Sequence, residues 1–362
     1  MQEAHCPPGV SWAQRLEEMV IEAKAADEFG WDWYGAGEQH FAIEDAATSS
    51  APEILHAALA RVTERIRFRP MSTNLIKYNH PIRIAEQVAA LDILSGGRAE
   101  LGGARSNNPF TLEAFGVDPR ETRAQRDEAL TILGKAWSGE MIEHHGAIYD
   151  IPPRRIAPQP LQRPTPPVHI SATGVDSHAG AARMGIGVMT GNSILGWDYA
   201  QSCFDAYRAN VGTGEPALGW SNNRISFSSI GVACAPTRDE AIAMGRDVAL
   251  QFVSIIVEFN QIIARQSDDY AYLGQVAKLA DRKDDLEYLM GAAPYITIGT
   301  PDDLIERAAA IHAMGADDLI YRLDGMGHEN NMKAIELIGR HVVPAVHAFD
   351  AHAESTPFPG SD

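Results

Sequence analysis

The chain has 362 residues, 45% of them hydrophobic and 22% charged, an ordinary globular composition with enough apolar material for a large core. The formal net charge of −18 argues against binding to nucleic acid or to an anionic membrane, because both need clustered Lys and Arg. Cys6, Cys203 and Cys234 form no C-x-x-C pair, and the N-terminus lacks the basic and apolar regions of a signal peptide. We therefore expect a cytoplasmic protein without a membrane span.

Short β-like runs alternate with amphipathic helical stretches, which predicts an α/β fold with a parallel sheet or barrel, organised as one domain over 1–362. The first helix is predicted to begin after Ser11, with Gln14 completing a capping box, and to end at Gly30. Pro70 interrupts one strand and suggests a bend there. Strands are predicted near residues 31, 66, 98, 168, 186, 225 and 317.

A closed TIM (β/α)8 barrel needs eight strands, and only seven are visible. The missing first strand should precede the Ser11 helix, where few residues remain. Either residues 1–6 form a stub strand or the first strand lies upstream of Met1, and we favour the second. The helical stretch 237–290 is long for a barrel helix, so about 251–290 is expected to be an inserted helical cap. The Pro-rich segment 140–167 is expected to cross the surface in an extended form.

Side chains just past the C-terminal ends of barrel strands face the active site. In this chain those positions are polar, and so many polar strand ends are typical of a cofactor site. They are Glu38-Gln39-His40-Phe41, Ser72-Thr73-Asn74, Arg105-Ser106-Asn107, Thr173-Gly174 and Gly191-Asn192.

The segment T-G-V-D-S ends a predicted strand and opens a helix, so backbone N–H groups and the helix dipole favour an anion there. Gly174 allows close backbone approach, and Ser177 adds a hydroxyl in the first turn. Arg105, on the neighbouring strand end, can grip a phosphate with its guanidinium. Alternatively, Ser177 only caps the helix and Arg105 pairs with an internal carboxylate.

Several longer segments together resemble bacterial luciferase and its relatives, from Ser11 to about Val346. They are GEQHF, NHPIRIAEQVAALDILSGGRAELGGARSNN, SATGVDSHAGAARMG and IGTPDDLIERAAAIHAMGADDL. The resemblance implies a flavin-dependent monooxygenase that uses reduced FMN and dioxygen on a small organic substrate. The chain has no G-x-G-x-x-G after a strand, so the reduced FMN is expected to come from a separate flavin reductase. A homo-oligomer paired through the second and third barrel helices is also implied.

The same resemblance assigns individual residues. Arg123 is expected to join Arg105 on the phosphate, and the flavin ring is expected against a non-prolyl cis peptide bond between Ser72 and Thr73. Gln39 replaces the His to which the family's catalysis is tied, and Gln cannot titrate.

His40 is therefore the candidate proton carrier, the alternative being a core histidine whose hydrogen bonds are satisfied. Ala104 replaces the family's reactive cysteine, so light emission from aldehydes is not expected.

Other functions stay open at this point. The same fold could hold a deazaflavin for hydride transfer without oxygen, or the chain could be a non-catalytic flavin-binding subunit. No metal site is expected, because Asp324, His328 and Glu329 lack a second His at ligand spacing and fit a helix cap better. Substrate contacts are expected mainly from the helical cap at 251–290, the loop 106–116 and the N-terminal segment.

Overall fold

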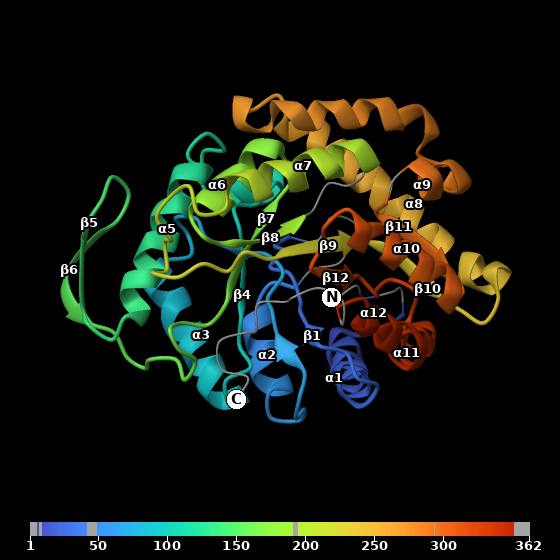
Figure 1. The fold of residues 1–362 in the computed structure, drawn as a ribbon, viewed down its shortest axis with the longest axis horizontal. Coiled ribbons are helices and arrows are strands. Elements are labelled where there is room, and N and C mark those ends of the chain that lie inside the picture. Colours follow the sequence, from blue (N-terminus) through green and yellow to red (C-terminus); the bar gives the residue numbers. More distant parts are fainter. Residues whose placement is uncertain (1–5, 7–8, 42–48, 191–194, 293, 351–362) are drawn as a thin grey trace.

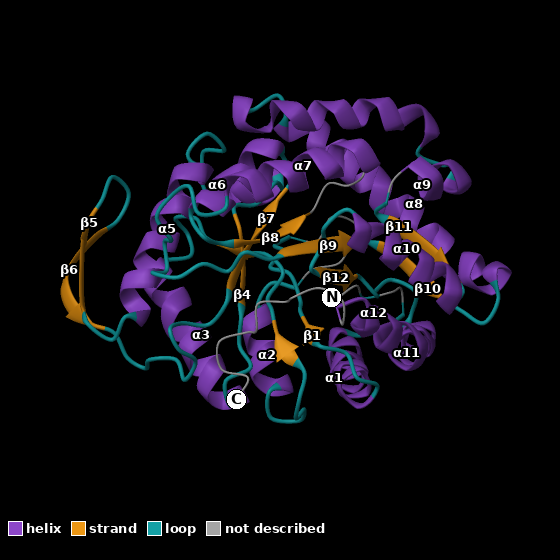
Figure 2. Ribbon diagram, in the orientation of Figure 1, coloured by secondary structure: helices purple, strands orange, loops and turns teal. Residues whose placement is uncertain are grey.

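The computed structural model describes residues 6, 9–41, 49–190, 195–292 and 294–350. Parallel strands form the middle of the molecule and helices surround them (Figures 1 and 2). Six strands pair in the order β12-β9-β8-β7-β4-β3, while β1 pairs with β2 and β10 with β11. An isolated bridge between Phe68 and Ala99 joins β2 to the chain leading into β4. The strands are β1 (Trp33–Tyr34), β2 (Arg67–Phe68), β3 (Thr73–Asn74), β4 (Leu101–Ala104), β5 (Met141–His145), β6 (Asp150–Arg155), β7 (Val168–Ala172), β8 (Gly187–Thr190), β9 (Ile225–Ser229), β10 (Gly231–Cys234), β11 (Ile296–Gly299) and β12 (Asp318–Tyr321).

The helices follow the predicted alternation with the strands. They are α1 (Trp12–Glu28), α2 (Pro52–Leu59), α3 (Pro81–Ser95), α4 (Pro109–Ala114), α5 (Thr122–Trp137), α6 (Val175–Arg183), α7 (Trp197–Asn210), α8 (Arg238–Ile263), α9 (Leu286–Ala292), α10 (Pro301–Ala313), α11 (His328–Leu337) and α12 (Val343–Asp350), with a 3₁₀ segment η2 (Asp268–Arg282) and a π turn η3 (Ile338–Val342).

The fold is a TIM-type α/β barrel with an inserted helical segment, as predicted. All seven predicted strands are present, and the one near residue 66 breaks at Pro70 into β2 and β3. Residues 1–5, most of the stub strand that was the less favoured alternative, lie outside the described residues. Two features were missed. Within the Pro-rich segment, residues 141–155 form the antiparallel hairpin β5–β6, which projects from the side of the barrel, and β11 pairs in parallel with β10.

Local chemistry explains the ends of the first helix. The Ser11 hydroxyl accepts a hydrogen bond from the Gln14 backbone N–H at 3.1 Å. The Gln14 side chain donates to Glu18 instead of returning to Ser11, so the reciprocal half of the predicted capping box does not form. The helix ends at Glu28, and Gly30 turns the chain at φ +90°, a conformation that favours glycine.

The break at Pro70 depends on a glycine in the neighbouring strand. A Cβ on Gly102 in β4 would lie 1.8 Å from the Pro70 carbonyl oxygen, so only glycine fits against this bend. Met71 and Ser72 follow this bend at the C-terminal ends of the strands, where both line a cavity.

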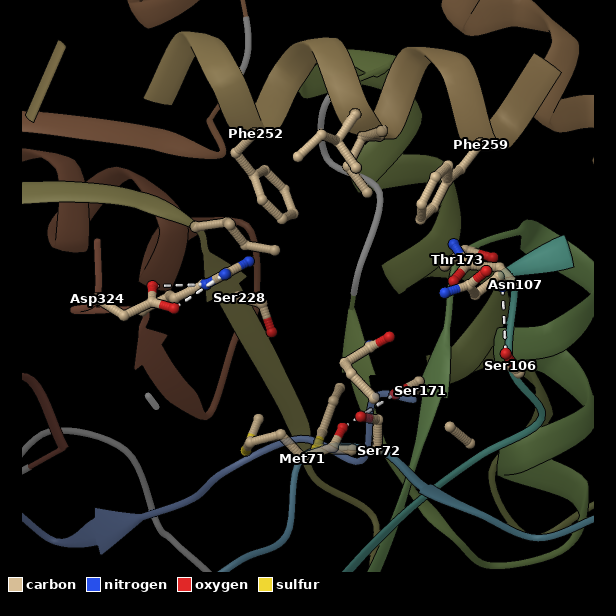
Figure 3. A pocket seen from close by; sticks show the side chains of 18 of the residues that line it. Met71, Ser72, Ser106, Asn107, Ser171, Thr173, Ser228, Phe252, Phe259 and Asp324 are labelled. Atoms are coloured by element: carbon tan, nitrogen blue, oxygen red, sulfur yellow. Dashed lines mark hydrogen bonds and ion pairs between the residues drawn. The ribbon is translucent and has the colours of Figure 1, made fainter. Parts of the chain in front are cut away.

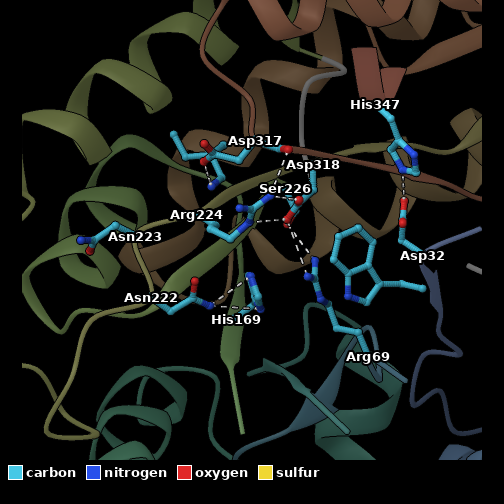
Figure 4. Close-up of polar contacts among 12 residues, drawn as sticks. Asp32, Arg69, His169, Asn222, Asn223, Arg224, Ser226, Asp317, Asp318 and His347 are labelled. Carbon is cyan, nitrogen blue, oxygen red and sulfur yellow. Dashed lines mark hydrogen bonds and ion pairs between the residues drawn. The ribbon is translucent and has the colours of Figure 1, made fainter. Parts of the chain in front are cut away.

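Paired charges fill the barrel interior below that open end (Figure 4). Arg69 Nε donates to Glu100 Oε2 at 2.6 Å, and Arg69 Nη1 donates to Ser226 Oγ at 2.9 Å. Ser226 Oγ in turn donates to Asp318 Oδ2 at 2.9 Å. All four residues are buried, and each lies earlier on its strand than the residues that line the cavity. The network therefore fills the barrel beneath the cavity with paired charges, although Arg69 Nη2 lies 3.6 Å from Asp318 Oδ2 and makes no hydrogen bond among the described residues.

Candidate functional site

A cavity of about 270 Å³ opens at the C-terminal ends of the strands, with α8 running across it (Figure 3). Its position is the one at which α/β barrels bind ligands. Hydroxyl groups and methionines from several strands make its floor, while α8 supplies an apolar wall. The floor residues are Met71, Ser72, Ala104, Ser171, Met189 and Ser228, and the wall residues are Val248, Gln251, Phe252, Ile255, Ile256 and Phe259.

The wall residues repeat every three or four positions along α8, so they share one face of the helix. The opposite face carries small and branched side chains such as Ala249, Val253 and Val257, which pack into a core cluster with α9 and β11. The inserted segment therefore serves two purposes: one face of α8 anchors the insertion and the other covers the cavity. Residues 251–290 were expected to contact substrate, and the cavity-lining residues of α8 from Gln251 to Phe259 lie in this range.

Glu38 ties together the ends of β1 and β3. This buried carboxylate accepts hydrogen bonds from the Asn74 backbone N–H at 2.8 Å and from Tyr78 Oη and Asn79 Nδ2, each at 2.9 Å. The Glu38 backbone N–H donates to Ser72 Oγ at 3.1 Å. Because so many donors converge on it, Glu38 sets the shape of this corner of the cavity.

His40 and Gln39, the predicted catalytic residues, both line the cavity. His40 Nε2 lies 2.9 Å from Glu38 Oε1, and the ring packs edge-on against Phe115 with centroids 5.0 Å apart. The Gln39 backbone N–H donates to the Ser49 carbonyl oxygen at 3.1 Å. A carboxylate that holds one ring nitrogen leaves the other nitrogen available to a ligand.

Arg105, directly after β4, also lines the cavity. Its Nη1 donates to Thr122 Oγ1 at 3.4 Å, and its guanidinium lies 4.1 Å from the centroid of the Tyr270 ring. Thr122 is the first residue of α5, and Arg123 follows it. The structure thus brings the ends of β4 and α5 together at this corner, where the two arginines were expected to meet.

Sequence reasoning missed a third arginine in the same corner. Arg126 is 3% exposed, and its Nη1 has no hydrogen-bond partner among the described residues. Burial lowers the pKa of Arg126; the nearby charge of Asp127 opposes this, while Arg105 and Arg123 add to it. Arg126 donates from Nε and Nη2 to Asp127 Oδ1 at 2.8 and 2.6 Å, so Nη1 is the atom that could donate to an anion. The sequence signal was the spacing of Arg123 and Arg126, since positions i and i+3 share a helix face.

At the start of α6, Ser177 acts as a cap. Its Oγ accepts from the Gly174 N–H at 3.0 Å and donates to the Gly174 carbonyl oxygen at 2.7 Å. This is the capping interpretation that the sequence left open. Neither residue lines the main cavity, although Thr173, immediately before them, does. Gly191 and Asn192, the next expected strand end, lie outside the described residues.

The peptide bond between Ser72 and Thr73 was predicted to be cis, and this prediction is wrong. The cis bonds among the described residues are Ala157–Pro158 and Arg163–Pro164, both before proline, where the cis form costs little. Ser72 is held at the cavity by the hydrogen bond from Glu38 instead. Thr73 faces away from the main cavity, into a smaller one beside α3, because successive strand residues point to opposite sides.

An ion pair that the sequence did not predict lies at the other end of the cavity, after β12 (Figure 3). Arg322 donates from Nε to Asp324 Oδ1 at 2.7 Å and from Nη2 to Asp324 Oδ2 at 2.9 Å. The Arg322 guanidinium lies 4.6 Å from the centroid of the Phe252 ring on α8. The pair is neutral as a whole, so it offers the cavity a fixed dipole and not a net charge.

Asp324, His328 and Glu329, the residues considered as metal ligands, do not point toward a common site. Asp324 pairs with Arg322, His328 Nδ1 lies 2.7 Å from Glu22 Oε1, and Glu329 accepts from Lys333 at 2.7 Å. Within the described ranges no group of three or more His, Cys, Asp or Glu side chains could hold a metal ion. No helix of the described part of the chain is long and apolar enough to cross a membrane.

A parallel barrel with a polar cavity at its strand ends and a helical insertion across it defines an α/β-barrel enzyme. The model of the luciferase-like monooxygenase family matches residues 3–318, and the chain belongs to this family. Its relatives are flavin-dependent oxidoreductases, using either FMN or the deazaflavin F420.

Among curated proteins, the chain is 26% identical over 357 residues to the oxygenase component of the flavin-dependent trigonelline monooxygenase of Acinetobacter baylyi, covering 92% of this chain and 90% of the other. Several other curated relatives align over only 42 to 59% of their own length.

Two solved structures show the same fold. The oxygenating constituent of 3,6-diketocamphane monooxygenase from Pseudomonas putida, in complex with FMN, has a TM-score of 0.72 at 22% identity, over 94% of this chain and 96% of that one. The F420-dependent tetrahydromethanopterin reductase from Methanopyrus kandleri has a TM-score of 0.68 at 18% identity, over 91% and 95%.

Proposed function

We propose that the chain is the oxygenase component of a two-component flavin monooxygenase. It takes reduced FMN from a separate flavin reductase and uses dioxygen to oxygenate a small organic substrate. The observation that carries the proposal is the cavity itself, with Arg105 and a carboxylate-held histidine in its lining and an apolar helix across it. The alignment over nearly the whole chain with the oxygenase component of such a system supports the same assignment.

The arginine corner fits the phosphate of FMN. The orphaned Nη1 of Arg126 and the guanidiniums of Arg105 and Arg123 are the groups that would hold it. Gly174 and Ser177 would contribute to the phosphate site from the start of α6, and Ser72 would contact the flavin ring from the cavity floor. Bound reduced flavin supplies the electrons that activate dioxygen.

His40 is proposed to carry the proton. Glu38 fixes the ring through Nε2, so Nδ1 is the nitrogen that gives a proton to, or takes one from, a bound molecule. Gln39 beside it contributes hydrogen bonds only. The apolar face of α8 excludes water from the same space, which protects reactive groups from unwanted protonation.

The deazaflavin alternative remains a second candidate, since a solved F420-dependent reductase shares the fold. The cavity lining does not separate the two cofactors. The hydrogen-bonded pair of Glu38 and His40 at the cavity argues against a non-catalytic subunit.

We also propose that two copies of the chain pair through α2 and α3, because the hydrophobic side chains of Ile54, Ile93 and Leu94 are exposed on these helices.

Binding and reoxidation measurements test the proposal. The purified chain should bind reduced FMN more tightly than reduced F420, measured by anaerobic equilibrium dialysis. On exposure to air, bound FMN should reoxidise more slowly than free FMN, followed by the return of its visible absorbance. Tighter binding of F420, with no effect on the reoxidation of FMN, would favour the deazaflavin alternative.

A further inference from the structure

The 3₁₀ segment η2 of the insertion reaches the arginine corner. Tyr270 Oη donates to the Ser106 carbonyl oxygen at 2.9 Å and hydrogen bonds with Thr122 Oγ1 at 3.1 Å. Its ring lies against the Arg105 guanidinium. A segment more than 140 residues away in the chain therefore contacts the strand end and helix start that were expected to hold a phosphate.

Tyr272 lies two residues further on and contacts the start of α6. Its hydroxyl hydrogen bonds with Thr173 Oγ1. A Cβ built on Gly174 would lie 3.0 to 3.2 Å from three atoms at the hydroxyl-bearing end of the Tyr272 ring. The ring therefore packs directly on Gly174, on the backbone that an anion at this helix start would approach.

We propose that Tyr272 is a gate for the cofactor phosphate. Its ring takes the place of the phosphate at the start of α6, so η2 must shift before a phosphorylated flavin can seat fully. The inference rests on the proposed flavin site and adds a residue that sets its affinity. If only the fraction of molecules with Tyr272 displaced can bind phosphate, the apparent dissociation constant rises by the inverse of that fraction.

The character of the side chain agrees with a gate that opens. Burial raises the pKa of Tyr272 to about 12, so the phenol is neutral at physiological pH. A neutral ring held by one side-chain hydrogen bond and by packing is displaced at modest cost, because a single hydrogen bond contributes only about 1 kcal/mol. The guanidiniums of Arg105 and Arg126 would attract the entering phosphate, which compensates for the lost contact.

The test compares two ligands that differ only in the phosphate. FMN and riboflavin are titrated against the full chain and against Tyr272→Ala and Tyr272→Phe, with affinities from equilibrium dialysis. We expect Tyr272→Ala to bind FMN about tenfold more tightly, the effect of losing one hydrogen bond and the ring contact. Riboflavin affinity should not change, and Tyr272→Phe, which keeps the ring, should fall between.

Tyr288→Ala is the matched control, because Tyr288 belongs to the same insertion, is half-buried and stacks on Arg282 away from the cavity. It should leave both affinities unchanged. Unchanged or weaker FMN binding in Tyr272→Ala would overturn the gate, as would an equal gain for both ligands.

Failure of the underlying flavin site is recognised separately. In that case the unmodified chain would not prefer FMN over riboflavin, and Arg105→Ala would not alter the ratio of their affinities. If Arg105→Ala removes the preference and Tyr272→Ala has no effect, the flavin site stands and only the gate is refuted.

Discussion

Glu38 Oε1 lies 2.9 Å from His40 Nε2, and the same carboxylate accepts the Asn74 backbone N–H at 2.8 Å. One buried acid therefore orients the candidate proton carrier and joins two strand ends. Its loss should affect both the chemistry and the fold, and these effects can be measured separately.

Glu38→Ala is expected to lower the free energy of unfolding by about 3 kcal/mol, because it leaves several buried donors without an acceptor. Glu329→Ala is the control: this exposed carboxylate pairs with Lys333 on the helix surface, and its loss should leave the stability nearly unchanged. Urea unfolding of both variants measures the difference. Equal costs would show that Glu38 does not hold this corner together.

His40→Asn is expected to slow reoxidation of bound reduced FMN in air by about 100-fold, because the amide cannot accept or give up a proton. Flavin affinity should not change. His145→Asn serves as the control, since this exposed histidine lies in the β5–β6 hairpin away from the cavity. Stopped-flow absorbance measures the rate, and a rate like that of the unmodified chain would leave His40 structural.

Arg126→Met is expected to weaken FMN binding by about 10- to 100-fold, the value of a charge-assisted hydrogen bond, while riboflavin binding stays the same. Arg120→Met is the control, because Arg120 is exposed on the neighbouring loop and pairs with Asp118. Equilibrium dialysis with both ligands measures the effect. Equal losses for FMN and riboflavin would mean that Arg126 supports the fold and not the phosphate.

The chain is expected to lose stability as the pH falls below about 6.5. Burial lowers the pKa of His56 and His169 to about 3 and that of His178 to about 4, from an ordinary 6.5. These rings stay neutral in the folded chain, while the unfolded chain takes up protons below pH 6.5 and is favoured. Each contributes up to about 1.4 kcal/mol per pH unit between pH 6.5 and its folded pKa.

Urea unfolding between about pH 7 and pH 5 measures this slope. His178→Gln should reduce the slope by about a third, since one of three buried histidines is removed. An unchanged slope in this variant would show that His178 is protonated in the folded chain and would refute the explanation.

Gly102→Ala is expected to destabilise the fold by about 3 kcal/mol or more, because the new methyl group would overlap the Pro70 carbonyl oxygen and push against Met189. Gly180→Ala is the control: its Cβ would meet only Arg183 Nη2 at 4.0 Å, and alanine should favour α6 by up to about 1 kcal/mol. Thermal unfolding compares the two. Similar midpoints would show that the bend at Pro70 can move.

Much of the barrel could be predicted from the sequence because its signals are local. Ser11, Pro52 and Gly96 mark helix ends through their own backbone and side-chain chemistry. The β5–β6 hairpin and β11 were missed because local sequence signals for them were absent or misleading. β11 pairs in parallel with β10, so its partner is distant in sequence and no turn signal joins the two. The prolines of the hairpin also argued against a strand.

Some residues of the candidate site could likewise be placed from the sequence, and others only from the tertiary structure. The general rule that barrel strand ends face the cavity is enough to place His40, Ser72 and Arg105 there from the sequence alone. Which way Thr73 points depends on where the bend at Pro70 falls, and the role of Tyr272 depends on a contact with Thr173, 99 residues away. Such contacts are set by packing between elements, so no local pattern in the sequence encodes them.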